Sequence, residues 1–204
     1  MDRREFWENK IIKWENAKYD RSHWIDFNSS LKKRQSLSLE LMKQVIPGRV
    51  VVEYGCGTGR MMDSVLEIGA KKYFGVDFSS AAIRTAKMRV RSSDAIRTEL
   101  ICSPIEGLAP IPADLSFSLG LMDWVEPKEV ARLSAPLFLH SFSELRPASW
   151  QQAAHRAYSQ WINIKGHRPA YFRKEDLQKV FYRPGIQFYQ NSHLSFGGFI
   201  HNLS

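Results

Sequence analysis

From Arg49 onward, short apolar runs alternate with segments of helical spacing, and this alternation limits the fold more than any other feature. Helices are predicted between the runs, with Ser79 as the N-cap of one helix and Pro127 in the first turn of another. Strands that alternate with helices predict right-handed crossovers and a doubly wound, mainly parallel α/β sheet. The predicted strands are RVVVEY (49–54), KKYFGVDF (71–78), TELIC (98–102), DLSFSLGL (114–121) and PLFLHSF (136–142).

The remaining segments are predicted to complete one domain over residues 1–204. Aromatic residues at helical spacing predict an N-terminal helical cap, and two β-like runs near the other end predict an antiparallel hairpin at the sheet edge. An aromatic and basic insertion is either a substrate lid or ordinary packing. The expected parts are the cap (1–47), the cofactor-binding core (48–143), the candidate substrate lid (144–170), and the last helix with the closing hairpin (171–204).

Composition places this chain of 204 residues among soluble globular proteins, with 44% hydrophobic and 25% charged residues. It contains neither a run long enough to span a membrane nor an apolar signal-peptide core, so a cytoplasmic protein is expected. Its two cysteines have no metal-binding spacing, and no metal site is predicted. The net charge of +8 leaves an anionic or nucleic-acid partner open, but the basic residues form short, separated groups, which favours an ordinary basic surface.

A glycine-rich turn follows the first predicted strand, in the stretch VVEYGCGTGR (51–60). Ligands of open parallel sheets bind at such a turn, beyond the carboxyl ends of the strands. The turn lacks the spacing and the lysine of a Walker A loop, and Arg60 stands where a dinucleotide fingerprint needs its third glycine. Glu53, predicted at the last position of the strand, would oppose a pyrophosphate but attract a cofactor that carries a sulfonium and an ammonium.

The same stretch resembles the first motif of the class I S-adenosylmethionine-dependent methyltransferases, an acidic residue followed by Gly-x-Gly-x-Gly. YFGVDFSSAAIRTAK (73–87) resembles the second strand and helix of that family. The resemblance covers about residues 49–143. It implies the Rossmann-like, seven-stranded fold with an antiparallel C-terminal hairpin, and S-adenosyl-L-methionine as the cofactor.

The resemblance also implies which residues hold the cofactor. The acid and the glycines of the first motif would hold the methionyl part, and Asp77 would hold the ribose hydroxyls. Side chains after the second and third strands would contact the adenine, and the N-terminal segment either covers the cofactor or lies as an amphipathic helix across the sheet. The expected set is Glu53, Gly55, Gly57, Gly59, Asp77, Phe78, Ser103, Ile105, Tyr19 and Arg34.

The methyl acceptor is less well defined, because methyl transfer by in-line displacement needs little beyond orientation and a path for a proton. The Asn/Asp-Pro-Pro-aromatic motif of amine methylases and the Pro-Cys nucleophile of cytosine methylases are both absent. Their absence favours a small-molecule acceptor, methylated at oxygen. An RNA methyltransferase and a non-catalytic, methyltransferase-like binding or scaffold domain stay open as alternatives.

The candidate residues for the chemistry follow the fourth and fifth predicted strands. Asp123 would orient or deprotonate an acceptor, or else cap the helix at Pro127. His140, predicted at the end of the fifth strand, is a general base or a structural histidine. The candidate substrate contacts, each with ordinary packing as its alternative, are Trp124, His155 and Trp161.

Overall fold

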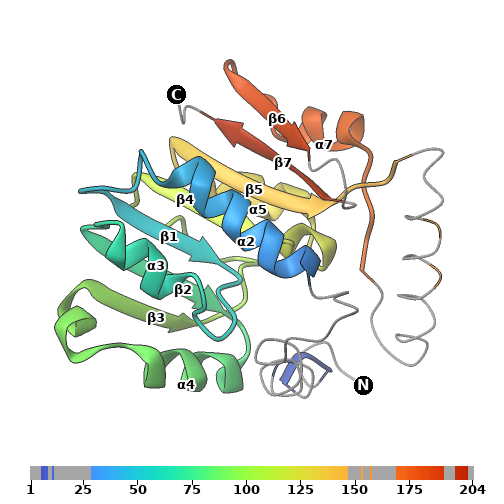
Figure 1. The fold of residues 1–204 in the computed structure, drawn as a ribbon. Coiled ribbons are helices and arrows are strands. Elements are labelled where there is room, and N and C mark those ends of the chain that lie inside the picture. Colours follow the sequence, from blue (N-terminus) through green and yellow to red (C-terminus); the bar gives the residue numbers. More distant parts are fainter. Residues whose placement is uncertain are drawn as a thin grey trace.

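In the computed structural model, the described part of the chain comprises residues 6–8, 11, 29–146, 153, 157, 169–190 and 196–201. These residues form a seven-stranded sheet with the order β3-β2-β1-β4-β5-β7-β6 and with helices on both faces (Figure 1). The strands are β1 Val50–Tyr54, β2 Lys72–Asp77, β3 Thr98–Cys102, β4 Leu115–Leu119, β5 Leu137–Ser143, β6 Ile186–Gln190 and β7 Phe196–His201.

Strands β1 to β5 are parallel, whereas β7 is antiparallel to both of its neighbours, β5 and β6. The expected doubly wound α/β fold with an antiparallel C-terminal hairpin is thus confirmed. Because the first five strands are parallel, their carboxyl ends meet at one edge of the sheet, and the N-terminal residues 6–8 lie beyond that edge (Figure 1).

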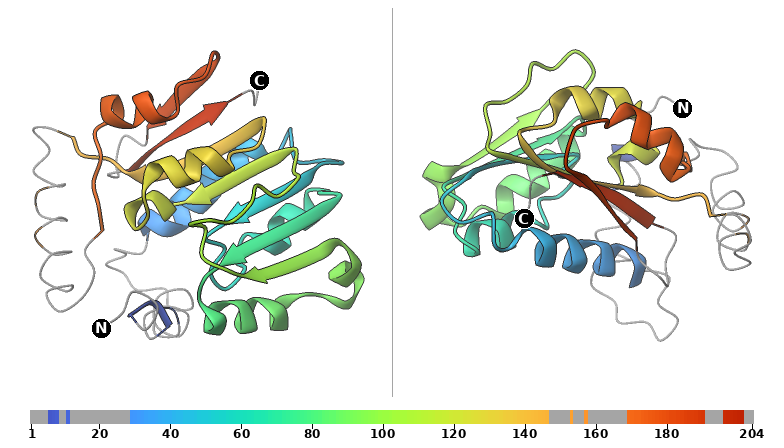
Figure 2. Two further views of the ribbon diagram at one scale, coloured as in Figure 1. Left: turned by 180° about the vertical axis from the view of Figure 1, so that it is seen from behind. Right: turned by 90° about the horizontal axis from the view of Figure 1, so that it is seen from above.

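The helices cover the sheet in two layers, which Figure 2 shows from behind and from above. Residues of α2 and α3 pack with Val51, Tyr73 and Phe117 on one face, and residues of α5 and α7 pack with Val52 and Phe138 on the other. The helical elements are α2 Ser29–Met42, α3 Met62–Glu67, α4 Ser80–Arg89, η2 Ser92–Arg97, η3 Leu121–Asp123, α5 Pro127–Leu133 and α7 Lys174–Val180.

Local sequence explains where these helices begin and end. The hydroxyl of Ser79 accepts a hydrogen bond from the backbone N–H of Ala82 and so caps α4, as predicted. Pro127 stands in the first turn of α5, where its missing N–H costs nothing. Gly69 follows α3 with a φ of 109°, a left-handed conformation that suits glycine.

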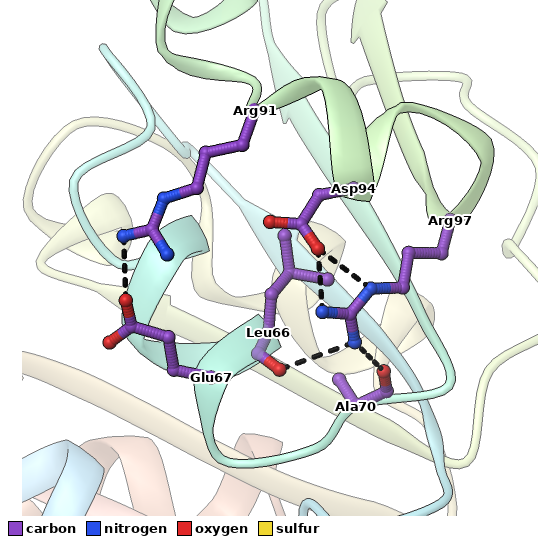
Figure 3. Close-up of polar contacts among 6 residues, drawn as sticks. All are labelled: Leu66, Glu67, Ala70, Arg91, Asp94 and Arg97. Atoms are coloured by element: carbon purple, nitrogen blue, oxygen red, sulfur yellow. Dashed lines mark hydrogen bonds and ion pairs between the residues drawn. The ribbon is translucent and has the colours of Figure 1, made fainter.

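The half-buried guanidinium of Arg97 joins η2 to the end of α3 (Figure 3). Asp94 accepts two hydrogen bonds from Arg97, of 2.9 Å from Nε and 2.6 Å from Nη2. The same guanidinium donates through Nη1 to the carbonyl oxygens of Leu66 and Ala70. Arg97 therefore adds a donor to the Leu66 carbonyl, which also accepts from the N–H of Gly69, and it holds the β3 side of the sheet against α3.

No helix among the described residues has both the length and the apolar character to cross a membrane. The predicted helix in the candidate lid lies outside the described residues, apart from the single helical residues Ala153 and Ala157.

Candidate functional site

The glycine turn lies at the carboxyl end of β1, between β2 and β4, where a ligand of this fold class is expected. Gly55, Gly57 and Gly59 all have positive φ, of 75°, 54° and 75°. Residues other than glycine rarely adopt this backbone conformation, so the turn requires its three glycines.

The three glycines differ in what surrounds them. A Cβ at Gly55 would lie 3.1 Å from Cδ1 of Leu121 in η3, and a Cβ at Gly59 would lie 3.1 Å from Cβ of Ala86 in α4. Those two glycines therefore allow close packing of the turn against its neighbours. A Cβ at Gly57 would meet no described atom within 4 Å. Gly57 thus leaves open space beside the backbone, which is what the methionyl part of the expected cofactor needs.

Asp77 ends β2 and joins the glycine turn to the start of α4. Its Oδ2 accepts from the backbone N–H of Gly57 at 2.9 Å, and its Oδ1 accepts from the N–H of Ser79 at 2.9 Å. Burial raises the pKa of Asp77, while its backbone N–H donors oppose that shift. The carboxyl group is placed at the strand end, as the expected role of ribose acceptor requires.

Glu53 differs from the prediction in two respects. It is the penultimate residue of β1, one place before the strand end at which it was expected. Its carboxyl group is also buried, with 3% of the residue exposed, and it accepts a hydrogen bond from the phenol of Tyr73. Burial raises the pKa of Glu53 to about 8, so the group is mostly protonated at pH 7. The fixed negative charge expected at the turn is therefore mostly absent at pH 7 without a bound cation.

The residues expected near the adenine lie after β2 and β3. The backbone N–H of Ser103 donates to the carbonyl oxygen of Asp77 at 3.0 Å, so the two loops are joined. Ile105 is buried, and Phe78 and Ser103 are partly exposed. The fold thus brings all three residues to the same edge as the glycine turn.

Arg34, from α2, reaches the end of β4. Its Nη1 lies 3.7 Å from Oδ2 of Asp123, and its guanidinium lies 4.9 Å from the centre of the Phe196 ring. A Cβ at Gly120 would collide with this guanidinium. Its buried Nε has no hydrogen-bond partner among the described residues, so the group retains a donor that suits a carboxylate.

Asp123 holds the neighbouring strand end together. Its Oδ1 accepts from the N–H of Ser143 and its Oδ2 accepts from the hydroxyl of Ser143, both at 2.6 Å. Burial raises the pKa of Asp123, and the charge of Arg34 lowers it. The alternative role as a helix cap is wrong, because Glu126 is the N-cap residue of α5. This geometry favours a positioning role for Asp123 over that of a base.

Asp123 also holds the chain where the candidate lid returns. Its carbonyl oxygen accepts from the N–H of Ala170 at 2.7 Å, and the carbonyl oxygen of Ser143 accepts from the N–H of Phe172 at 3.0 Å. The segment that leaves β5 and the segment that re-enters at 169–172 are therefore both fastened beside η3.

The predicted position of His140 at the end of the fifth strand is wrong, because β5 continues to Ser143 and His140 pairs with Phe199 of β7. The imidazole is fully buried. Its Nδ1 lies 2.9 Å from the hydroxyl of Ser118, and its Nε2 lies 3.0 Å from the hydroxyl of Ser134. Burial, together with the charge of Arg183, lowers its pKa to about 3. The geometry favours a neutral, structural histidine.

We expect His140→Gln to lower the free energy of unfolding by about 2 kcal/mol, because at least one buried hydroxyl loses its partner. The affinity for S-adenosylhomocysteine should stay within about twofold, since the imidazole does not reach the carboxyl edge of the sheet. Urea denaturation and calorimetry measure the two quantities. Unchanged stability combined with loss of methyl transfer would restore the role of a base.

Two aromatic residues of the N-terminal segment join the site without having been singled out as site residues. The ring of Trp7 lies 4.6 Å from that of Trp124, nearly perpendicular to it, and the ring of Phe6 lies 6.1 Å from that of Trp124. The hydroxyl of Ser80 donates to Glu8 at 3.0 Å. The sequence shows that these aromatic residues have helical spacing. It does not show that they contact Trp124 at the end of β4.

Several expected site residues lie outside the described residues, namely Tyr19, His155 and Trp161. Among the residues that the structure describes, no three His, Cys, Asp or Glu side chains are grouped so that they could hold a metal ion.

Comparison with known proteins agrees with this geometry. Residues 51–138 match the family model of the methyltransferase domain. The magnesium protoporphyrin IX methyltransferase ChlM from Synechocystis PCC 6803, solved with bound SAH, shares the fold with a TM-score of 0.74 at 13% sequence identity, over 98% of each chain. The DhpI-SAM-HEP complex shares it with a TM-score of 0.65 at 13% identity, over 96% of this chain and 94% of that one.

The ribosomal protein L11 methyltransferase of Shigella sonnei is 23% identical over 119 residues, which are 48% of this chain and 41% of that protein. The chain thus spans about two fifths of the length of this curated relative. The match to the methyltransferase domain over residues 51–138 and the shared fold agree with the resemblance of the motifs to the class I S-adenosylmethionine-dependent methyltransferases. The two solved neighbours contain the expected cofactor or its product.

Proposed function

We propose that this protein transfers the methyl group of S-adenosylmethionine to an oxygen atom of a small molecule. The observation that carries the cofactor assignment is the space at Gly57 that no described atom fills, beside a carboxylate that ends the next strand. Glycine backbone, Asp77 and a buried arginine together offer partners for the methionyl part, the ribose and the carboxylate of one ligand.

The chain's own residues would bind and orient the reactants. Asp77 would accept the ribose hydroxyls, the turn 55–59 would lie against the methionyl part, and Arg34 would pair with its carboxylate. When bound, the cofactor supplies an activated methyl group. Asp123 would keep the end of β4 in place for the acceptor through its bonds to Ser143.

A small acceptor is supported by a solved neighbour that matches 98% of this chain, a methyltransferase of magnesium protoporphyrin IX. The net charge of +8 favours an anionic acceptor, which has oxygen atoms to methylate. The same charge keeps RNA as the alternative substrate. An RNA methyltransferase would lose activity steeply between 50 and 200 mM salt, whereas transfer to a small molecule would change little.

The direct test is the transfer of label from methyl-labelled S-adenosylmethionine into the small-molecule, protein and RNA fractions of a cell extract. We expect label in the small-molecule fraction, released by mild base if the product is an ester. Label only in RNA or protein would reject the proposal. Binding of the cofactor without any transfer would support a scaffold domain instead.

We expect Asp77→Asn to weaken S-adenosylhomocysteine binding by about 30-fold, or roughly 2 kcal/mol, because the amide keeps the shape but loses the charged acceptor. Asp114→Asn is the matched control. Asp114 accepts the backbone N–H of Val50 at 2.8 Å, at the other end of β1. Equal affinities of the two variants in calorimetry would show that Asp77 does not hold the ribose.

A further inference from the structure

Three aromatic side chains meet beyond the carboxyl end of β4. Phe6 and Trp7 come from the N-terminal segment, and Trp124 directly follows η3. Their ring centres lie 4.6 to 6.1 Å apart, and the Trp7 and Trp124 rings meet edge to face at 83°. All three residues are partly buried, so each keeps part of its surface exposed. We call this group the aromatic cluster.

The aromatic cluster lies on the side of the candidate site that is formed by the end of β4. Leu121, three residues before Trp124, lies beside the glycine turn, since a Cβ at Gly55 would be 3.1 Å from its Cδ1. On the other side, Glu8 is bonded to Ser80, the first residue of α4, three residues after Asp77. Residues 6–8 therefore extend from the end of β2 to the end of β4, and their aromatic side chains lie at the β4 end. That end is opposite to the residues expected to hold the nucleoside.

We infer that Phe6, Trp7 and Trp124 recognise the methyl acceptor, and that this acceptor carries a flat, conjugated ring next to the oxygen that is methylated. The inference rests on the proposed function, since it names the substrate class of the same site. Flat rings pack against aromatic faces and edges over a larger area and with better electrostatic fit than saturated rings of equal size. The positive net charge adds a preference for an anionic group on the ring.

An anchoring role is the competing explanation for the aromatic cluster. In that case the rings would only fasten the N-terminal segment to η3, and removal of one ring would loosen the segment without changing the choice of acceptor. The two explanations differ in ligand preference, which is measurable by binding alone and needs no turnover.

The test compares two probes with the same ring skeleton and butyrate chain, 4-(1-pyrenyl)butyrate and its fully hydrogenated analogue 4-(perhydropyren-1-yl)butyrate, by calorimetry in the presence of saturating S-adenosylhomocysteine. We expect the flat probe to bind the full chain at least about 30-fold more tightly than the saturated one. Trp124→Leu and Trp7→Leu should each reduce this ratio by about tenfold or more, with S-adenosylhomocysteine affinity kept within about twofold. Trp124→Phe should retain most of the ratio.

Tyr182→Leu is the control, because Tyr182 is an aromatic residue that is 84% exposed and lies after α7, outside the aromatic cluster. It should leave the ratio unchanged. Equal binding of the two probes to the wild-type protein would overturn the inference, as would a ratio that survives both tryptophan substitutions. Loss of S-adenosylhomocysteine binding in both variants would overturn it too, since the rings would then support the cofactor. The proposed function fails separately, through the absence of label transfer to small molecules.

Discussion

Gly57→Val is expected to weaken S-adenosylhomocysteine binding by at least about 100-fold, or roughly 2.8 kcal/mol. The reason is steric, because a side chain at this position would occupy the space beside the turn that no described atom fills. The new residue would also have to adopt a φ of 54°, which costs roughly 1–2 kcal/mol of folding stability. Calorimetric titration and urea denaturation measure the two effects separately.

Gly48→Val provides the matched control. Gly48 has a φ of 74°, and a Cβ there would also meet nothing within 4 Å, but it precedes β1 at the opposite edge of the sheet. The two variants should lose similar amounts of stability, and only Gly57→Val should lose the ligand. Similar ligand affinities in both variants would remove the glycine turn from the binding site.

The stability of the ligand-free protein is expected to fall as the pH rises toward 8, because of Glu53. Its pKa is 4.5 in the unfolded chain and about 8 in the folded protein, so the folded state binds an extra proton between these values. The stabilisation that protonated Glu53 contributes is complete below pH 4.5 and is lost as the pH rises to about 8. The free energy of unfolding should therefore fall by roughly 2 kcal/mol between pH 6.5 and 8.

Glu53→Gln isolates this effect, because the amide can still accept from Tyr73 but carries no titratable proton. The unfolding free energy of the variant should be nearly independent of pH from 6.5 to 8. His140 does not interfere in this window, since its lowered pKa affects stability only below about 6.5. Parallel pH profiles of the two proteins in urea denaturation would contradict the assignment.

A bound cation should reverse the preference of Glu53 for the neutral form. Saturating S-adenosylmethionine is expected to flatten the pH dependence of the wild-type protein more than S-adenosylhomocysteine does, since the homocysteine compound lacks the sulfonium charge. An equal effect of both compounds would mean that the sulfonium does not approach Glu53.

The sequence predicted the elements of this fold well, because each signal was local. Alternating apolar runs located the strands, and Ser79 and Pro127 marked the helix starts that the structure has. The glycine turn and Asp77 also came together as predicted, since successive parallel strands place their carboxyl ends side by side.

The sequence could not predict how polar groups pair across distant strands. His140 was expected at the end of β5, but it lies three residues before that end and pairs with Phe199 of β7, nearly sixty residues later. The charge state of Glu53 depends on Tyr73, which a different strand brings beside it. The hydrogen bonds between Asp123 and Ser143 likewise depend on the pairing of β4 with β5.

The place of β7 between β5 and β6 sets an order for folding during synthesis. When β5 has left the ribosome, its backbone edge and the apolar face around Phe138 and Phe142 are not yet covered, because β7 is made much later. Until residues 196–201 emerge and enter between β5 and β6, that edge is open to other chains. The nascent protein is therefore most exposed to aggregation through the β5 edge while residues between β5 and β7 are being translated.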